Sequence, residues 1–240
     1  MMLMVRVLAV SVAVLVAGLA APTAAQESPQ DPPLTGPADQ LEASLTCPAV
    51  FSHPEREPVL LVHGTFTNDD ENWGWNYGLV LPREGFDVCT VRLPNRSLDD
   101  IQIASEYAVH AIEVIHAATG RKVDVIGHSQ GGIEPRWAVR WWSSARAAVD
   151  DLVMLAAPNH GTGAGGDGRS ACFDACHQMR AGSAFLAALN TDETPGDIAY
   201  TSVYSSFYDE LVTPAESSAL VDDGPRVTNV EIQARRRPPH

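Results

Sequence analysis

Short apolar runs of strand length alternate with longer segments of helical periodicity over most of this chain. β-Branched and large apolar residues fill the runs, as is typical of buried strands. The longest helical segment ends near Ala118, with Ser97 or Asp99 as its N-cap and Gly120 as its closing residue. Strands that alternate with helices predict an α/β fold, a mostly parallel sheet with helices on both faces. The expected strands are residues 58–64, 86–93, 122–126, 151–157, 198–204 and 227–233.

The N-terminal residues lie outside this alternation. Arg6 precedes an apolar stretch from Val7 to Ala21 that is too short to span a bilayer, and small residues follow up to Ala25. This pattern predicts a signal peptide and secretion to the extracellular space, with an N-terminal membrane anchor as the alternative. The predicted parts are a signal peptide over 1–25, a flexible leader over 26–45, an α/β domain over 46–233 and an aberrant basic tail over 234–240.

The charge balance is acidic, with 30 acidic against 16 basic residues and a formal net charge of −14. Such a charge argues against nucleic acid and anionic membrane surfaces as partners. We therefore expect no stable membrane insertion and a monomeric secreted protein.

The cysteine count is even, and an even count in an exported chain indicates disulfides. The spacing favours the pairs Cys47–Cys89 and Cys172–Cys176. A zinc site at Cys172, Cys176 and His177 is the rival interpretation, but no second ligand pair stands at zinc spacing. We therefore predict no metal and no other cofactor.

The pentapeptide Gly127-His128-Ser129-Gln130-Gly131 carries the main chemical signal. It follows an expected buried strand and precedes an expected helix, which is the setting of a nucleophile elbow. In that turn the serine hydroxyl points at substrate, and the backbone N–H of the next residue faces the developing oxyanion. The pattern predicts Ser129 as nucleophile and Gln130 as an oxyanion-hole donor.

Other reactive residue types also follow expected strands, at the sheet edge where α/β proteins collect function. Thr65 comes directly after the first long strand and offers both an N–H and a hydroxyl to the oxyanion hole. Asp209 follows the strand at 198–204 and is the expected acid of a catalytic triad, with Glu210 as its near rival. His63 and His128 neighbour this site, and we expect them to shape the pocket.

Four segments in combination resemble the secreted class 2 lipases of bacteria and, more distantly, yeast lipase B. The resemblance implies an α/β-hydrolase that cleaves carboxylic esters of the triacylglycerol type through an acyl-enzyme, without a cofactor. Matched by motif, Ser129 is the nucleophile, Asp209 the triad acid, and Thr65 with Gln130 the oxyanion hole. Cys47 and Cys89 match the N-terminal disulfide of the family. The segments are Pro58–Thr65, Gly127–Gly132, Ala156–Thr162 and Tyr208–Val212.

The resemblance breaks down after residue 233. In the family, the matching strand leads to a loop with the catalytic histidine and then to a closing helix. Here an Arg- and Pro-rich tail ends at His240, so we expect a truncated or frameshifted chain that lacks the histidine loop and the closing helix. His240 is the only histidine beyond Asp209, so either His240 is the base or the base is lost.

The reach of His240 bears on the activity that we expect. Six residues separate it from Gln233, which is about 20 Å of extended chain, but Pro238 and Pro239 stiffen the approach. We therefore expect little or no esterase activity unless His240 folds back onto Asp209 and Ser129. The functions left open are a secreted lipase or esterase, a truncated and catalytically impaired hydrolase, and an acyltransferase or polyester hydrolase on the same scaffold.

Overall fold

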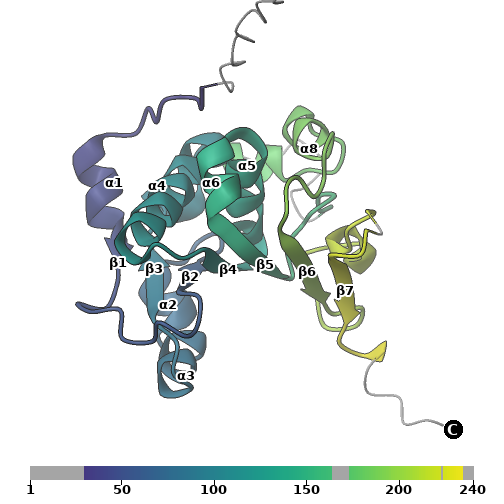
Figure 1. Cartoon of the computed structure of the whole chain (residues 1–240). Coiled ribbons are helices and arrows are strands. Elements are labelled where there is room, and N and C mark those ends of the chain that lie inside the picture. The colour runs from purple at the N-terminus through teal and green to yellow at the C-terminus, as the bar shows by residue number, and fades with distance from the viewer. Residues whose placement is uncertain (1–29, 164–172, 223, 235–240) are drawn as a thin grey trace, which may run out of the picture. The chain divides into compact units, whose positions relative to one another are not determined.

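A seven-stranded sheet in the order β1-β3-β2-β4-β5-β6-β7 forms the centre of the computed structural model, which describes residues 30–163, 173–222 and 224–234 (Figure 1). β1 pairs antiparallel with β3, and every other neighbouring pair is parallel. The prediction of an α/β fold with a mostly parallel sheet is confirmed. The strands are β1 (Leu45–Thr46), β2 (Val59–Val62), β3 (Val88–Val91), β4 (Val123–His128), β5 (Val149–Leu155), β6 (Ala199–Tyr204) and β7 (Val227–Glu231).

Helices lie on both sides of the sheet. In Figure 1, α4, α5 and α6 lie on one side of it, and α2 with α3 lies on the other. Three short 3₁₀ segments, η1 (Pro94–Ser97), η2 (Ser129–Gly132) and η3 (Ala215–Ser218), lie between the longer elements. The α-helices are α1 (Ala38–Ser44), α2 (Asp69–Trp73), α3 (Tyr77–Arg83), α4 (Ile101–Thr119), α5 (Ile133–Trp141), α6 (Ser143–Ala148), α7 (Asp174–Gln178) and α8 (Ala184–Leu189).

The helix α4 matches its sequence prediction closely. Its N-cap is Asp100, whose side chain accepts a hydrogen bond from the N–H of Gln102, so the helix begins slightly later than a cap at Ser97 or Asp99 would give. Gly120 ends the helix in the left-handed conformation, with φ of 66°. The segments 69–83 and 174–189 each contain two short helices, α2 with α3 and α7 with α8.

The core has a large and a small part because the sheet has two covered faces. All four residues of β2 are buried, as expected for a central strand that is covered on both sides. On one face Leu60 and Val62 join a large apolar cluster with the buried stripe of α4. On the other face Val59 and Leu61 pack with Trp73 of α2 in a smaller cluster.

The folded structure begins earlier than the predicted boundary at residue 46. Asp31 accepts hydrogen bonds from the N–H groups of Ser143 and Ser144 at the start of α6. Burial raises the pKa of Asp31, but hydrogen bonds from the side chains and the backbone N–H groups of Ser143 and Ser144 outweigh it and lower the pKa to about 2. Farther along, Glu106 accepts from the N–H groups of Thr35 and Gly36. Side chains remote in sequence thus anchor a segment whose composition alone suggests a flexible leader.

A disulfide joins Cys47, just after β1, to Cys89 in β3, with an S–S distance of 2.04 Å, and this confirms the expected pair. Cys176 is also disulfide-bonded, whereas its expected partner Cys172 lies outside the described residues. The predicted signal peptide likewise lies outside them. Among the helices that the structure describes, none is long and apolar enough to cross a membrane.

Candidate active site

Ser129 occupies a sharp turn between β4 and α5. Its φ is 55°, a left-handed value that non-glycine residues rarely adopt and that is typical of a strained functional turn. The neighbouring glycines have no room for a side chain. A Cβ on Gly127 would lie 2.1 Å from the carbonyl oxygen of Gly131, and a Cβ on Gly131 would lie 2.4 Å from the carbonyl oxygens of Val62 and His63. These contacts give the strand–turn–helix geometry of a nucleophile elbow.

The turn after β2 lies directly against this elbow. A Cβ on Gly64 would lie 3.1 Å from the Cβ of Ser129 and 2.9 Å from the carbonyl oxygen of His128. Thr65, the next residue, donates its hydroxyl to Oε1 of Gln130 at 2.5 Å. The structure therefore brings Thr65, Ser129 and Gln130 together, as the sequence predicts.

Gln130 is held at both ends of its side-chain amide. Its Nε2 donates to Oε1 of Glu134 at 2.8 Å, and both residues are fully buried. Burial raises the pKa of Glu134 to about 8, and the hydrogen bond from Gln130 lowers this pKa only in part. Sequence reasoning missed Glu134. Its signal was an acidic residue in the first turn of the helix that follows the elbow.

Asn72, in α2, links the Thr65 turn to the elbow. Its Oδ1 accepts from the N–H of Gly64 at 3.2 Å, from the hydroxyl of Thr67 at 3.3 Å and from Nδ1 of His128 at 3.0 Å. One buried amide oxygen thus receives donors from both halves of the candidate site. Nothing in the local sequence pattern distinguishes Asn72 from other polar helix residues.

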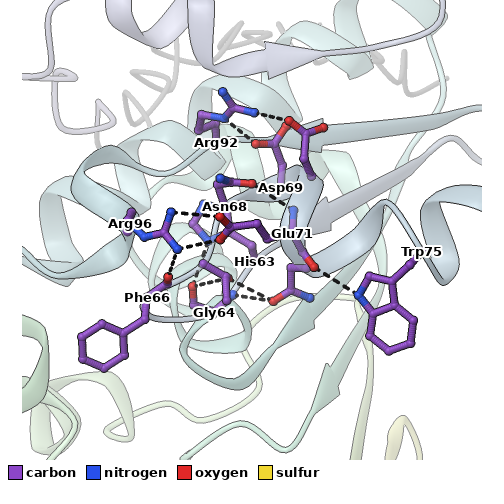
Figure 2. Close-up of polar contacts among 12 residues, drawn as sticks. His63, Gly64, Phe66, Asn68, Asp69, Glu71, Trp75, Arg92 and Arg96 are labelled. Atoms are coloured by element: carbon purple, nitrogen blue, oxygen red, sulfur yellow. Dashed lines mark hydrogen bonds and ion pairs between the residues drawn. The ribbon is translucent and has the colours of Figure 1, made fainter.

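His63 supports the turn and is not available as a base. Its Nε2 accepts the N–H of Leu93 at 2.9 Å, so Nδ1 carries the proton and donates to the carbonyl oxygen of Gly64, also at 2.9 Å (Figure 2). Burial lowers the pKa of His63 and keeps the ring neutral. Both nitrogens are therefore engaged with backbone groups.

Asp209 lies in the loop that follows β6. Its Oδ1 accepts the N–H groups of Leu211 and Val212 at 3.0 and 2.8 Å, which fixes the turn around it. Desolvation lowers the pKa of His128, and the negative charge of Asp209 acts in the opposite direction. The charge of Asp209 therefore acts on the residue that directly precedes Ser129. Glu210, its rival, is exposed.

The segment after β5 has a structural role. Asn159 is buried, donates to the carbonyl oxygen of Ser218 at 2.6 Å and accepts from Arg136 at 3.2 Å. Nε2 of His160 lies 2.9 Å from Oε1 of Glu193. Through Arg136, these contacts connect the loops beside the site to α5. His240, the histidine that the sequence singles out as candidate base, lies outside the described residues.

Three carboxylates come together at the opposite end of the sheet. Oxygen atoms of Asp124, Asp150 and Asp151 lie within 4.8 Å of one another at the start of β4 and β5. Burial and the neighbouring carboxylates raise the pKa of Asp124 to about 7. Nζ of Lys122 pairs with Asp150 at 3.0 Å. This cluster lies at the amino ends of the strands, whereas Ser129 lies at a carboxyl end, so it takes no part in the candidate active site.

A family model for the alpha/beta hydrolase family matches residues 59–239. The chain belongs to the alpha/beta hydrolase family. Lipase B of Pseudozyma antarctica is 30% identical over 207 residues, which is 85% of this chain and 60% of that protein. The crystal structure of Aspergillus fumigatus lipase B is 31% identical with a TM-score of 0.76, and the match covers 86% of this chain and 52% of that one.

A more distant likeness shows the shared fold alone. The mature form of the Bacillus licheniformis lipase BlEst2 is 18% identical with a TM-score of 0.64, and the match covers 78% of this chain and 88% of that one. This alpha/beta hydrolase chain spans between half and two thirds of the length of the two lipase B proteins.

Proposed function

We propose that this protein is a secreted serine hydrolase that cleaves carboxylic esters through an acyl-enzyme on Ser129. The observation that carries the proposal is the left-handed backbone of Ser129, held at the end of β4 between glycines whose Cβ atoms would clash with neighbouring carbonyl oxygens. Membership of the alpha/beta hydrolase family and the likeness to two lipase B proteins support an ester as the substrate. The predicted signal peptide and the Cys47–Cys89 disulfide support export.

In the proposed first step, the Oγ of Ser129 attacks the ester carbonyl and the carbonyl oxygen becomes an oxyanion. The N–H groups of Gln130 and Thr65 are the expected donors to that oxygen. The hydroxyl of Thr65 is already engaged with Gln130, so the backbone donors carry this role in the free enzyme. Loss of the alcohol then leaves the acyl group on Ser129, and water releases it in the second step.

The proton of Ser129 needs a base, and the base needs an acid that stabilises its charged form. Asp209 is the proposed acid, since it follows β6 and acts electrostatically on this side of the sheet. Among the described histidines at this edge, His63 uses both nitrogens on backbone groups and His160 pairs with Glu193. The candidates for the base are therefore His128 and His240, of which His240 lies outside the described residues.

Labelling with a fluorophosphonate followed by peptide mapping tests the nucleophile. We expect one adduct, on the peptide that contains Ser129, and none in Ser129→Ala. Ser144, an exposed serine on α6, provides the matched control, because Ser144→Ala should label like the unsubstituted chain. An adduct that persists in Ser129→Ala would reject the proposal.

Hydrolysis of p-nitrophenyl butyrate by the same proteins tests the base. His240→Ala and His128→Ala are compared with the unsubstituted chain, and the variant without its base should lose about 10⁴-fold in kcat. Turnover that withstands both substitutions would place the base elsewhere. Comparison with p-nitrophenyl palmitate then separates a lipase from a short-chain esterase.

A further inference from the structure

The residue directly after Thr65 has an unusual backbone. Phe66 has φ of 65°, although bulky aromatic residues seldom adopt left-handed values. Its side chain is 60% exposed, so core packing does not impose this conformation. The ring makes one edge-to-face contact, with Phe173 at 5.1 Å between centroids, and the contacts that fix the peptide itself are made to its backbone.

Arg96 makes those contacts on both sides of Phe66. The N–H of Phe66 donates to the carbonyl oxygen of Arg96 at 2.9 Å, and the guanidinium of Arg96 donates in return to the carbonyl oxygen of Phe66. Figure 2 shows the guanidinium between Phe66 and Glu71. The two segments lie 30 positions apart in sequence, one after β2 and the other after β3.

Glu71 fixes the guanidinium in this position. Nη1 of Arg96 lies 3.2 Å from Oε1 of Glu71, and Nη2 lies 2.6 Å from Oε2, so the carboxylate accepts from two nitrogens (Figure 2). The hydrogen bond from Arg96 is the main cause that lowers the pKa of Glu71. Glu71 in turn donates its N–H to the side chain of Asn68, the N-cap of α2. Helix α2 thus holds Glu71 in place for its contact with Arg96.

The segment that carries Arg96 is strained in the same way as its partner. Asn95, Arg96 and Ser97 have φ values of 43°, 56° and 58°, three successive left-handed residues without a glycine. The amide of Asn95 donates to Asp99 at 2.9 Å and supports the turn. Strained backbone of this kind persists only where surrounding contacts impose it, and it concentrates at functional sites.

From these contacts we infer that Arg96, anchored by Glu71, is a positioning residue that holds the Thr65–Phe66 turn in the geometry needed for the oxyanion hole. The inference rests on the proposed function, because it assigns the purpose of the contact to the Thr65 N–H. Arg96 reaches the backbone of the turn and acts through it. A lysine could not replace it, because one ammonium group cannot bond to Phe66 and to both oxygens of Glu71 in this planar arrangement.

The test uses Arg96→Met, Arg96→Lys and Glu71→Gln, with Arg92→Met as matched control. Arg92 is exposed to a similar degree and also forms ion pairs with α2, through Asp69 and Asp70, but makes no hydrogen bond to the turn. Two quantities are measured in the full chain: amide hydrogen exchange over residues 64–67, and kcat and KM with p-nitrophenyl butyrate. Thermal melting confirms that each variant is folded.

In Arg96→Met we expect exchange at Phe66 to quicken about 10-fold or more, and kcat to fall by about 10- to 100-fold with KM nearly unchanged. Arg96→Lys and Glu71→Gln should give intermediate losses, and Arg92→Met should leave both quantities as they are. If Arg96→Met does not fold, the two milder variants decide the question by the same measures.

Unchanged exchange and kcat in these variants would overturn the inference, as would equal losses in Arg92→Met or a rise in KM at constant kcat. Failure of the proposed function has a different signature, which is the absence of a fluorophosphonate adduct on Ser129 in the unsubstituted chain. In that case quickened exchange in Arg96→Met would leave Arg96 with a structural role and reject its part in the oxyanion hole.

Discussion

Glu134 offers a direct test of the physical description of the site, because it is a fully buried carboxyl group beneath Gln130. Replacement of Glu134 by glutamine keeps an oxygen that can accept from Nε2 of Gln130 and removes the titration. We predict that Glu134→Gln gains stability relative to the unsubstituted chain as the pH rises from 4.5 to 8.

The sign follows from the two pKa values of the group. Its pKa is 4.5 in the unfolded chain and about 8 in the folded protein. Below pH 4.5 both states are protonated and the carboxyl group makes no pH-dependent contribution. Between these values only the unfolded chain releases the proton, so the unfolded state gains stability and the free energy of unfolding falls. Above pH 8 both states are ionised and the loss levels off.

The magnitude follows from the same difference. Each pH unit between the two pKa values corresponds to about 1.4 kcal/mol. The unsubstituted chain should therefore lose up to about 3 kcal/mol between pH 4.5 and 7, and up to about 5 kcal/mol by pH 8, relative to Glu134→Gln. This is a large part of the stability of an ordinary domain.

Urea unfolding at pH 5, 6, 7 and 8 measures the effect, with Glu42→Gln as control because Glu42 is exposed on α1. The difference in unfolding free energy between Glu134→Gln and the unsubstituted chain should widen with pH, and the Glu42→Gln difference should stay constant. Any fixed effect of the new amide group cancels in this comparison. A Glu134→Gln difference that stays flat from pH 5 to 8 would refute the reasoning.

Three further predictions concern other parts of the fold. Gly131→Ala should destabilise the protein by about 3 kcal/mol or more in urea unfolding, because its Cβ would lie 2.4 Å from two carbonyl oxygens. Gly120→Ala, with open space around the new Cβ, should cost about 1 kcal/mol, and equal costs for the two substitutions would contradict the prediction. Replacement of both Cys47 and Cys89 by serine should cost about 4 kcal/mol, since the bond closes a loop with a sequence separation of 42, and a reducing agent should then have little further effect on this loop. Asp31→Asn should lower the melting temperature at pH 7, and this difference should disappear as the pH falls from 3.8 through about 2, where the native carboxylate itself becomes protonated. A difference that persists below pH 2 would argue against a stabilising role of the hydrogen bonds that Asp31 accepts from Ser143 and Ser144.

The sequence by itself determined the fold class and the position of the elbow. Apolar periodicity shows which residues are buried, and glycine or proline marks where an element ends, so the six longer strands along the chain and the end of α4 at Gly120 could be predicted. The elbow could be predicted for the same reason. The glycines around Ser129 are required by steric contacts within the turn itself, so they appear as a short motif in the sequence. The disulfide between Cys47 and Cys89 was also predicted, because only a few pairings were available. The short strand β1 and the order of the strands in the sheet were not predicted.

The tertiary structure decided which polar residues meet. Hydrogen bonds join Asn72 to His128, Arg96 to Phe66 and Glu106 to Thr35, which are 56, 30 and 71 residues apart in the sequence. Each of these residues is polar and lies in a segment whose pattern records only helix, turn or leader. Periodicity shows which face of an element is covered, but the partner of a polar side chain depends on which elements the sheet brings side by side. The support around Thr65 and Ser129, and the true start of the folded domain, therefore became visible only when the strands were placed next to one another.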